Sequence, residues 1–108
     1  MDFDLAGVVR AVAAAVPDRE AIVHREGRLT YADFVARADR LANVLHGHGL
    51  GAHRERSGLA GWESGQDHLA LYLHNGPEYL EAMLGAYCAR VAPFNVNYRY
   101  VAEELRYL

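Results

Sequence analysis

Apolar positions in the second half of the chain follow first a strand pattern and then a helix pattern. Residues 69–73 form a continuous apolar run, which favours a strand covered on both faces in a parallel sheet. An Asn-Gly-Pro turn at 75–77 then opens a helix, which we expect to continue to about Ala89 and, being apolar nearly all round, to be largely buried. The run 91–94 predicts a second strand, so we expect a parallel β-α-β unit with a right-handed crossover.

The first part of the chain predicts a helix followed by a hairpin. Residues 4–16 favour helix, in which Asp2 or Asp4 can accept hydrogen bonds from the first free amides, and Pro17 ends it. Residues 20–24 and 28–30 predict two short strands joined by a turn at Glu26-Gly27.

Thr30 and Asp33 have the spacing of a capping box, which predicts that a second helix begins at Tyr31. We expect Asp33 and Arg37, four residues apart, to pair on its exposed face. The opposite face repeats at three- and four-residue intervals and predicts a core stripe of Phe34, Ala38, Leu41 and Leu45.

The glycine-rich segment 47–52 superficially matches a dinucleotide-binding pattern. That pattern follows a strand and opens a helix, whereas these glycines follow a helix, so we interpret them as a C-terminal cap and turn. Residues 53–65 are polar and glycine-rich without periodicity, which predicts a flexible loop. Residues 101–108 begin another helix without a C-cap, from which we expect Leu108 to interrupt a longer polypeptide.

Composition narrows the class of protein. With 108 residues, 52% of them hydrophobic, the chain can bury one modest core, so we expect one domain or less. A formal net charge of -3 argues against nucleic acid as a partner. All eleven basic residues are arginine, which excludes chemistry that needs a lysine ammonium group.

The N-terminus lacks the features of a secretory signal, and no apolar run approaches the roughly 18 residues of a membrane span. Cys88 is the only cysteine, so no internal disulfide can form, and we expect a reducing, cytoplasmic location. Attachment to an anionic membrane surface is disfavoured because the first predicted helix carries only one basic residue, Arg10.

Residue types that often carry chemistry are few. His46, His48 and His53 invite a metal site, but the first two point in different directions and no cysteine lies nearby. Cys88 lies on the helix predicted to be buried, with no histidine near it in sequence, which favours an unreactive thiol. Residues 61–65 place a serine one position too late for a nucleophile elbow. The residues therefore predict no catalytic, cofactor-binding or metal-ligating side chain.

Ligands of parallel sheets bind at the carboxyl ends of the strands, where His74, Asn75, Asn95 and Asn97 are expected to lie. Two interpretations stay open for these side chains. They contact a ligand, or Asn75 caps the following helix while Asn95 and Asn97 stabilise turns.

At several of these segments the chain resembles the N-terminal segment of the adenylate-forming acyl-CoA synthetases, especially the bacterial fatty-acid-CoA ligases of actinobacterial type. The resemblance covers nearly the whole chain in order, at PDREAIV (17–23), LTY (29–31), RLANVL (40–45), GLG (49–51), LALYLHNGPEYL (69–80), PFNVNYRY (93–100) and EELRYL (103–108). It implies an α/β fold in which residues 1–108 are a partial N-terminal portion of the AMP-binding domain, with a β-hairpin and a parallel β-α-β unit.

The chain departs from the family pattern in two places. The loop at about 53–64 is longer than in many family members, and Cys88-Ala89-Arg90-Val91 stands where a Lys-Ala-Gly run is common. Neither departure removes a catalytic group.

The resemblance implies a full-length ligase that uses ATP, Mg²⁺ and coenzyme A to convert a fatty or related carboxylic acid to an acyl-adenylate and then to a thioester. In this family the phosphate loop, the magnesium site and the reactive lysine lie further along the polypeptide. The resemblance therefore implies that these 108 residues are structural, bind no cofactor alone and have the remainder of their own polypeptide as partner. The alternative is a free-standing small α/β binding module without catalysis.

Overall fold

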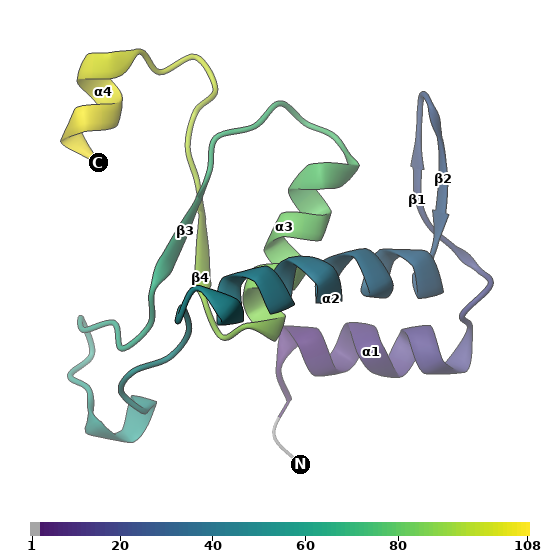
Figure 1. Cartoon of the computed structure of the whole chain (residues 1–108), viewed down its shortest axis with the longest axis horizontal. Helices are drawn as coiled ribbons and strands as arrows, with labels where there is room; N and C mark the ends of the chain where they lie inside the picture. The colour runs from purple at the N-terminus through teal and green to yellow at the C-terminus, as the bar shows by residue number, and fades with distance from the viewer. Residues whose placement is uncertain (1–2) are drawn as a thin grey trace.

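The structure is a computed structural model that describes residues 3–108 of the chain. Three helices pack together at its centre, a β-hairpin stands at one end, and a pair of parallel strands stands at the other (Figure 1). The helices are α1 (Leu5–Ala15), α2 (Tyr31–Gly47), α3 (Pro77–Cys88) and α4 (Ala102–Tyr107), with a 3-10 turn η1 (Arg56–Gly58) between α2 and the parallel strands.

The predicted caps of the first two helices are confirmed. Asp4 accepts a hydrogen bond from the Gly7 amide at 2.7 Å and caps α1, whereas Asp2 lies outside the described residues. At the start of α2 the Thr30 hydroxyl accepts from the Asp33 amide at 3.1 Å, and the Asp33 carboxylate accepts in return from the Thr30 amide. These bonds satisfy amides that an isolated helix start would leave unpaired.

The end of α2 is a glycine cap, as predicted. Gly49 has φ 76°, and the Leu50 amide donates back to the Leu45 carbonyl at 3.1 Å. This left-handed turn closes the helix, because glycine adopts positive φ without the steric cost of a Cβ.

The hairpin consists of β1 (Glu20–His24) and β2 (Gly27–Thr30), paired antiparallel with an irregularity between Glu20 and Ile22. The turn lies at residues 25–26, one position earlier than predicted, because Gly27 already pairs with His24.

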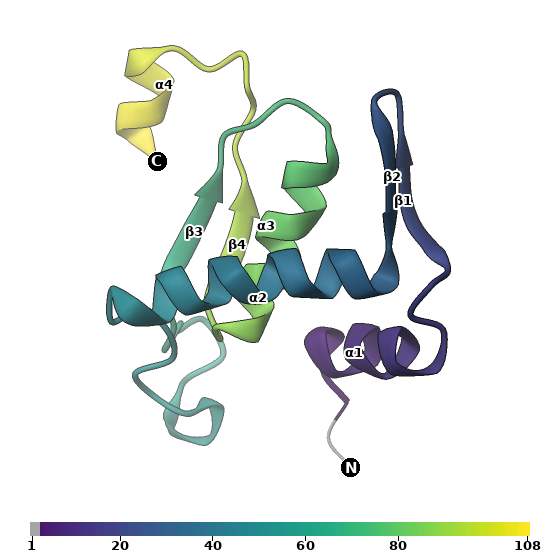
Figure 2. The same ribbon diagram turned by 45° about the vertical axis from the view of Figure 1, so that its right-hand side comes forward.

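The β-α-β unit is confirmed. Strands β3 (His68–Leu71) and β4 (Ala92–Asn95) pair parallel, with Leu69 opposite Pro93, and α3 connects them with Pro77 in its first turn. In Figure 2 the two strands lie side by side next to α3. The first strand ends two residues before the end of the apolar run 69–73, because its last ladder contact is the Leu71 carbonyl, which accepts from the Val96 amide at 3.1 Å.

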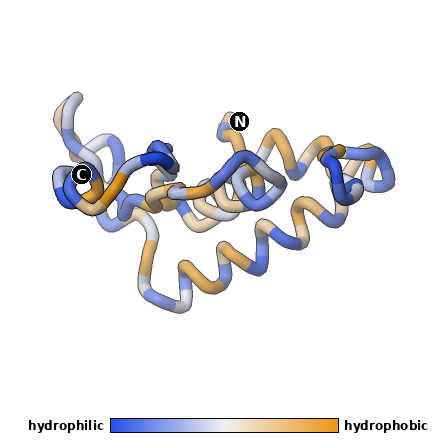
Figure 3. Tube along the Cα trace, turned by 90° about the horizontal axis from the view of Figure 1, so that it is seen from above, coloured by the Kyte–Doolittle hydropathy of each residue, from blue (hydrophilic) through white to orange (hydrophobic). Residues whose placement is uncertain are grey.

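The core lies between α2 and its neighbours, and the predicted stripe on α2 is confirmed. Ala38 and Leu45 are buried, and Phe34 and Leu41 pack against the same two apolar clusters. In Figure 3 apolar and polar positions alternate along this long helix. The clusters combine α2 residues with residues of α1, α3 and the turn before β4, namely Ala6, Leu84, Ala86 and Val91.

Helices α2 and α3 approach closely at Gly85. A Cβ at this position would lie 2.9 Å from Leu41 Cδ2 and 3.0 Å from the Ala38 carbonyl oxygen, closer than side-chain contacts ordinarily come. The absence of a side chain at Gly85 therefore sets the distance between the two helices.

Two burial predictions were wrong. Only Leu84, Gly85 and Ala86 of α3 are fully buried, and Leu80 is 47% exposed. Strand β3 is covered on one face alone, since Leu71 is buried while its neighbour Ala70 is exposed. Among the described residues no second layer packs on that open face. The strand is therefore more apolar than its one-sided burial requires.

The predicted Asp33–Arg37 pair was also wrong. The Arg37 guanidinium instead pairs with Glu81 of α3, which ties the two helices together beside their close crossing and raises the pKa of Arg37. A partner 44 residues away competes with one four residues away, because tertiary packing brings Glu81 to the same side of α2.

The arrangement is open for its size. The radius of gyration is 15.4 Å, whereas a compact domain of this length has about 13 Å. The accessible surface is 7900 Å², against about 6,000 Å² for a compact monomer of 12.0 kDa. About 1,900 Å² of surface is therefore exposed beyond what a self-contained fold of this mass leaves open. None of the helices among residues 3–108 is long and apolar enough to cross a membrane.

Candidate functional site

The carboxyl ends of the two parallel strands come together in one cluster. The His74 ring, just after β3, lies against the Tyr98 ring, just after β4, with 4.5 Å between their centroids. The Tyr72 hydroxyl donates to the Tyr100 carbonyl oxygen at 2.5 Å. These contacts hold the two loops side by side at the end of the sheet where parallel α/β folds bind ligands.

The asparagines at this end have different roles. Asn97 stabilises a turn, as one interpretation predicted: its Oδ1 accepts from the Arg99 amide at 3.0 Å. The prediction that Asn75 caps α3 was wrong, because Gly76 occupies the N-cap position and no side chain bonds to the cap. Asn95 is the exposed last residue of β4, and ligand contact by any of these side chains stays a prediction.

Sequence reasoning missed the aromatic and cationic part of this cluster. The Arg99 guanidinium carbon lies 5.6 Å from the centroid of the Tyr98 ring, and that tyrosine is 47% exposed. The signal was present in the sequence as an Asn-Tyr-Arg-Tyr run at 97–100, shortly after a strand. The cluster offers an aromatic face, a cation and backbone polar groups, which suits binding by stacking and hydrogen bonding.

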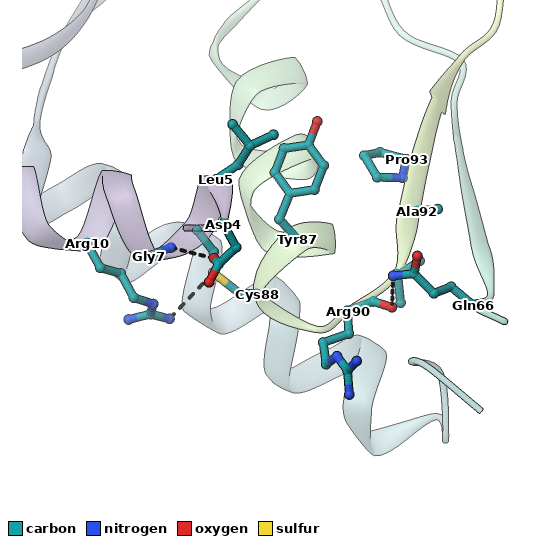
Figure 4. A pocket seen from close by; sticks show the side chains of 12 residues that line it. Asp4, Leu5, Gly7, Arg10, Gln66, Tyr87, Cys88, Arg90, Ala92 and Pro93 are labelled. Atoms are coloured by element: carbon teal, nitrogen blue, oxygen red, sulfur yellow. Dashed lines mark hydrogen bonds between the residues drawn. The ribbon is translucent and has the colours of Figure 1, made fainter. Parts of the chain in front are cut away.

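A hollow lies at the opposite end of the sheet. It has a volume of about 780 Å³ and opens between the start of α1, the end of α3 and the start of β4 (Figure 4). Asp4, Tyr87, Cys88 and Pro93 line it together with Arg10. Its position at the amino end of β4 is unlike that of ligand sites in parallel α/β sheets.

Cys88 borders this hollow and is half-buried, so the prediction of a buried thiol was wrong in degree. The Arg10 guanidinium lies 3.5 Å from its sulfur and also pairs with Asp39 of α2. The bond to Asp39 and then the contact with the thiol raise the pKa of Arg10. No histidine lies among the residues that line the hollow, and nucleophilic chemistry by a thiol needs a base or a strongly depressed pKa.

The three histidines considered for a metal are not brought together as a ligand set. His53 pairs with Asp67 at 2.5 Å, and the same carboxylate accepts from the Gly51 amide at 3.0 Å. Both bonds, first that of His53, lower the pKa of Asp67. Residues 3–108 contain no group of three or more His, Cys, Asp or Glu side chains placed to hold a metal ion.

Comparison with known proteins decides the family. Residues 9–108 match the family described as AMP-binding enzyme. The chain belongs to this family. The fold class and the family expected from the sequence are thereby confirmed, and the β-hairpin and β-α-β unit are parts of the N-terminal domain of adenylate-forming enzymes.

The similar AMP-binding enzymes include acyl-CoA ligases. The medium-chain acyl-CoA ligase Mig of Mycobacterium avium is 58% identical over 106 residues, which are 98% of this chain and 19% of that protein. The 3-oxocholest-4-en-26-oate–CoA ligase of Rhodococcus rhodochrous is 34% identical over 108 residues, or 17% of its length. A solved structure of a long-chain-fatty-acid CoA ligase from Rhodopseudomonas palustris has TM-score 0.79 and 33% identity, over 98% of this chain and 24% of that one. The chain thus spans less than a fifth of the length of these two curated relatives.

Proposed function

We propose that this chain is the N-terminal portion of an ATP-dependent acid–CoA ligase, with residues 1–108 forming part of its AMP-binding domain. The observation that carries this proposal is the 58% identity to the ligase Mig across 98% of the chain. The matched region spans nearly all of the strands, helices and connecting turns, so the chain is suited to the same place in a larger domain.

The proposed reaction has two steps. A carboxylate oxygen of the acid attacks the α-phosphorus of ATP, and pyrophosphate leaves from a mixed acyl-AMP anhydride. The thiolate of coenzyme A then attacks the acyl carbon, AMP leaves, and a thioester results. The first step is needed because a free carboxylate lacks a leaving group, whereas AMP is a good one.

The chain's own residues do not fit the reacting groups of this chemistry. It contains no lysine to stabilise phosphate charge, and residues 3–108 offer no three-ligand metal set. Within the proposal, ATP, Mg²⁺ and coenzyme A are bound by parts of the polypeptide outside these residues, and the contribution of this chain is to support those parts. This assignment leaves residues 1–108 without a catalytic side chain.

The remainder of its own polypeptide is the proposed partner. The surface excess of about 1,900 Å² and the open apolar face of the β3–β4 sheet support this, because parallel sheets are ordinarily covered on both faces. A further layer on the sheet would bury Ala70 and Phe94, which face the same side in the strand register.

We propose a medium-chain fatty acid as the substrate class, since Mig is named for medium-chain acyl groups. The relative from Rhodococcus is named for a steroid acid and shares a lower identity, which makes that acid the competitor to test. A cytoplasmic location is part of the same proposal, because ATP and coenzyme A are available there.

The deciding experiment uses the complete reading frame that contains these residues. The purified protein is incubated with ATP, Mg²⁺ and coenzyme A, and with octanoate, palmitate or 3-oxocholest-4-en-26-oate, and thioester and AMP are quantified. We expect octanoyl-CoA to form fastest, with one AMP per thioester. Formation of neither AMP nor thioester with every acid, or a reading frame that stops after Leu108, would refute the ligase proposal and favour the free-standing binding module.

A second measurement tests the structural role of the chain. Residues 1–108 alone are expected to form no acyl-adenylate from octanoate and ATP, under conditions in which the complete protein forms it. Adenylate formation by the 108-residue chain would contradict the assignment of catalysis to other parts of the polypeptide, while leaving the reaction itself intact.

A further inference from the structure

The two places where the sequence departs from the family pattern contact each other. Arg90 lies in the turn between α3 and β4 with φ 60°, a left-handed conformation that favours glycine. Its guanidinium donates to both carboxylate oxygens of Glu55, at 2.9 and 3.0 Å. Since Glu55 belongs to the long segment between α2 and β3, one arginine joins the unusual turn to the unusual loop.

The backbone of the same turn contacts the other end of the loop. The Arg90 carbonyl oxygen accepts a hydrogen bond from Gln66 Nε2 at 2.7 Å. The loop is thus fastened to the α3–β4 turn on both sides, by the side chain of Arg90 near its beginning and by the main chain of Arg90 near its end.

The loop is also closed on itself. Ala52 and Gln66 form an isolated antiparallel bridge, and the amides of His53 and Arg54 donate to the Gly65 carbonyl at 2.7 and 3.2 Å. Loops of this length whose ends meet are compact surface units rather than extended connections. Freeing the loop 53–65 therefore requires these closing bonds to open, and the bond from Arg90 to Glu55 lies beside them.

We propose that Arg90 is a latch that holds the loop 53–65 docked on the α3–β4 turn through Glu55, and that breaking this ion pair releases the loop. The flexibility predicted from the composition of the loop then depends on the Arg90–Glu55 ion pair. The pair is present in the docked state and absent in the released state. Release leaves the helices unchanged, because the latch contacts the turn and not the core. The proposal does not depend on catalysis by the protein.

Chemistry at both ends of the bond supports a latch. A bidentate arginine–carboxylate pair is more directional than a lysine pair and holds its partner in one orientation. The two hydrogen bonds from Arg90 lower the pKa of Glu55, so the carboxylate stays ionised at neutral pH. The pair is more than half exposed on both sides, which makes it sensitive to salt.

The left-handed turn allows the latch to be removed without damaging the fold. An Arg90→Gly variant loses the guanidinium but gains a residue that adopts φ 60° without strain. An Arg90→Gln variant loses the charge and keeps the strain. A latch predicts that both variants release the loop, whereas only the second lowers the overall stability.

Amide hydrogen exchange in the protein, read by mass spectrometry or NMR, tests the latch. In Arg90→Gly, Arg90→Gln and Glu55→Gln we expect the amides of His53 and Arg54 to exchange about two- to five-fold faster, the range for loss of an exposed ion pair. The double variant should exchange no faster than either single one. Arg28→Gln is the matched control, because it breaks the similarly exposed Arg28–Glu20 pair of the hairpin and should leave the loop amides unchanged.

Salt gives an independent arm of the test. In 1 M NaCl the wild-type loop amides should approach the exchange rates of the Arg90 variants, which themselves should change little. Trp62, the only tryptophan of the chain, lies in the loop and reports its motion by time-resolved fluorescence anisotropy. Equal exchange in wild type and all three variants, or a rise of the same size in Arg28→Gln, would overturn the latch.

Discussion

The close approach of α2 and α3 at Gly85 predicts how the substitution Gly85→Ala changes the free energy of unfolding. In Gly85→Ala the new Cβ meets Leu41 Cδ2 at 2.9 Å and the Ala38 carbonyl oxygen at 3.0 Å. Leu41 can adjust its rotamer, but the carbonyl belongs to the backbone of α2, so the helices must separate. Overpacking of this kind costs about 1–3 kcal/mol.

A second effect acts in the opposite direction. Alanine favours a helix interior over glycine by about 1 kcal/mol. The net expectation for Gly85→Ala is therefore a loss of about 1 kcal/mol in the free energy of unfolding, because the steric term exceeds the propensity term.

Gly47→Ala is the matched control. Gly47 is the last residue of α2, and a Cβ there has nothing within 4 Å, so only the propensity term remains. We expect this variant to gain up to about 1 kcal/mol, which places the two alanine variants about 2 kcal/mol apart. Urea denaturation of the protein followed by far-UV circular dichroism measures both. If Gly85→Ala proves as stable as Gly47→Ala, the helices are not in contact at that glycine and the reasoning fails.

Three further outcomes follow from single residues. Thr30→Ala should lower stability by about 1 kcal/mol by removing the cap on the Asp33 amide, as measured by urea denaturation. Gly49→Ala should cost about 1–2 kcal/mol, because a Cβ is disfavoured at φ 76°, and the thermal midpoint should fall accordingly. Asp67 has a lowered pKa because His53 hydrogen-bonds it, so its stabilisation is present above the ordinary carboxyl pKa of about 3.9 and is lost as pH falls below it. In Asp67→Asn that acid-dependent part of the stability curve should vanish, and an unchanged curve would contradict it.

Features that depend on neighbours in sequence were predictable. The capping box of Thr30 and Asp33, and Pro77 at the start of α3, need only residues within one turn, and the structure has them where the spacing placed them. The β-α-β unit was predictable for a related reason, because a helix of this length between two short apolar runs returns the chain parallel.

Features that depend on distant partners were not predictable. Arg37 has an acidic neighbour four residues away, and the sequence alone offers no reason to prefer Glu81. Likewise, nothing near Arg90 in the sequence indicates a bond to Glu55. At the candidate site, strand ends placed His74 and Asn97 correctly, but stacking on Tyr98 required the register of the two strands.

The wrong prediction that β3 is buried on both faces has a different cause. The apolar run predicts burial on both sides, yet α3 covers only the face of Leu71, while Ala70 and Phe94 stay exposed on the other. The apolar pattern suits a strand that is covered on both faces. The observed burial, in contrast, includes only the contacts made by residues 3–108. The extra accessible surface of about 1,900 Å² is independent support for the same missing burial, because it depends only on the mass and the surface area of the chain. Pattern and area both support a further layer on this sheet, and they are the physical basis for the supporting role that we propose for the chain in a larger ligase.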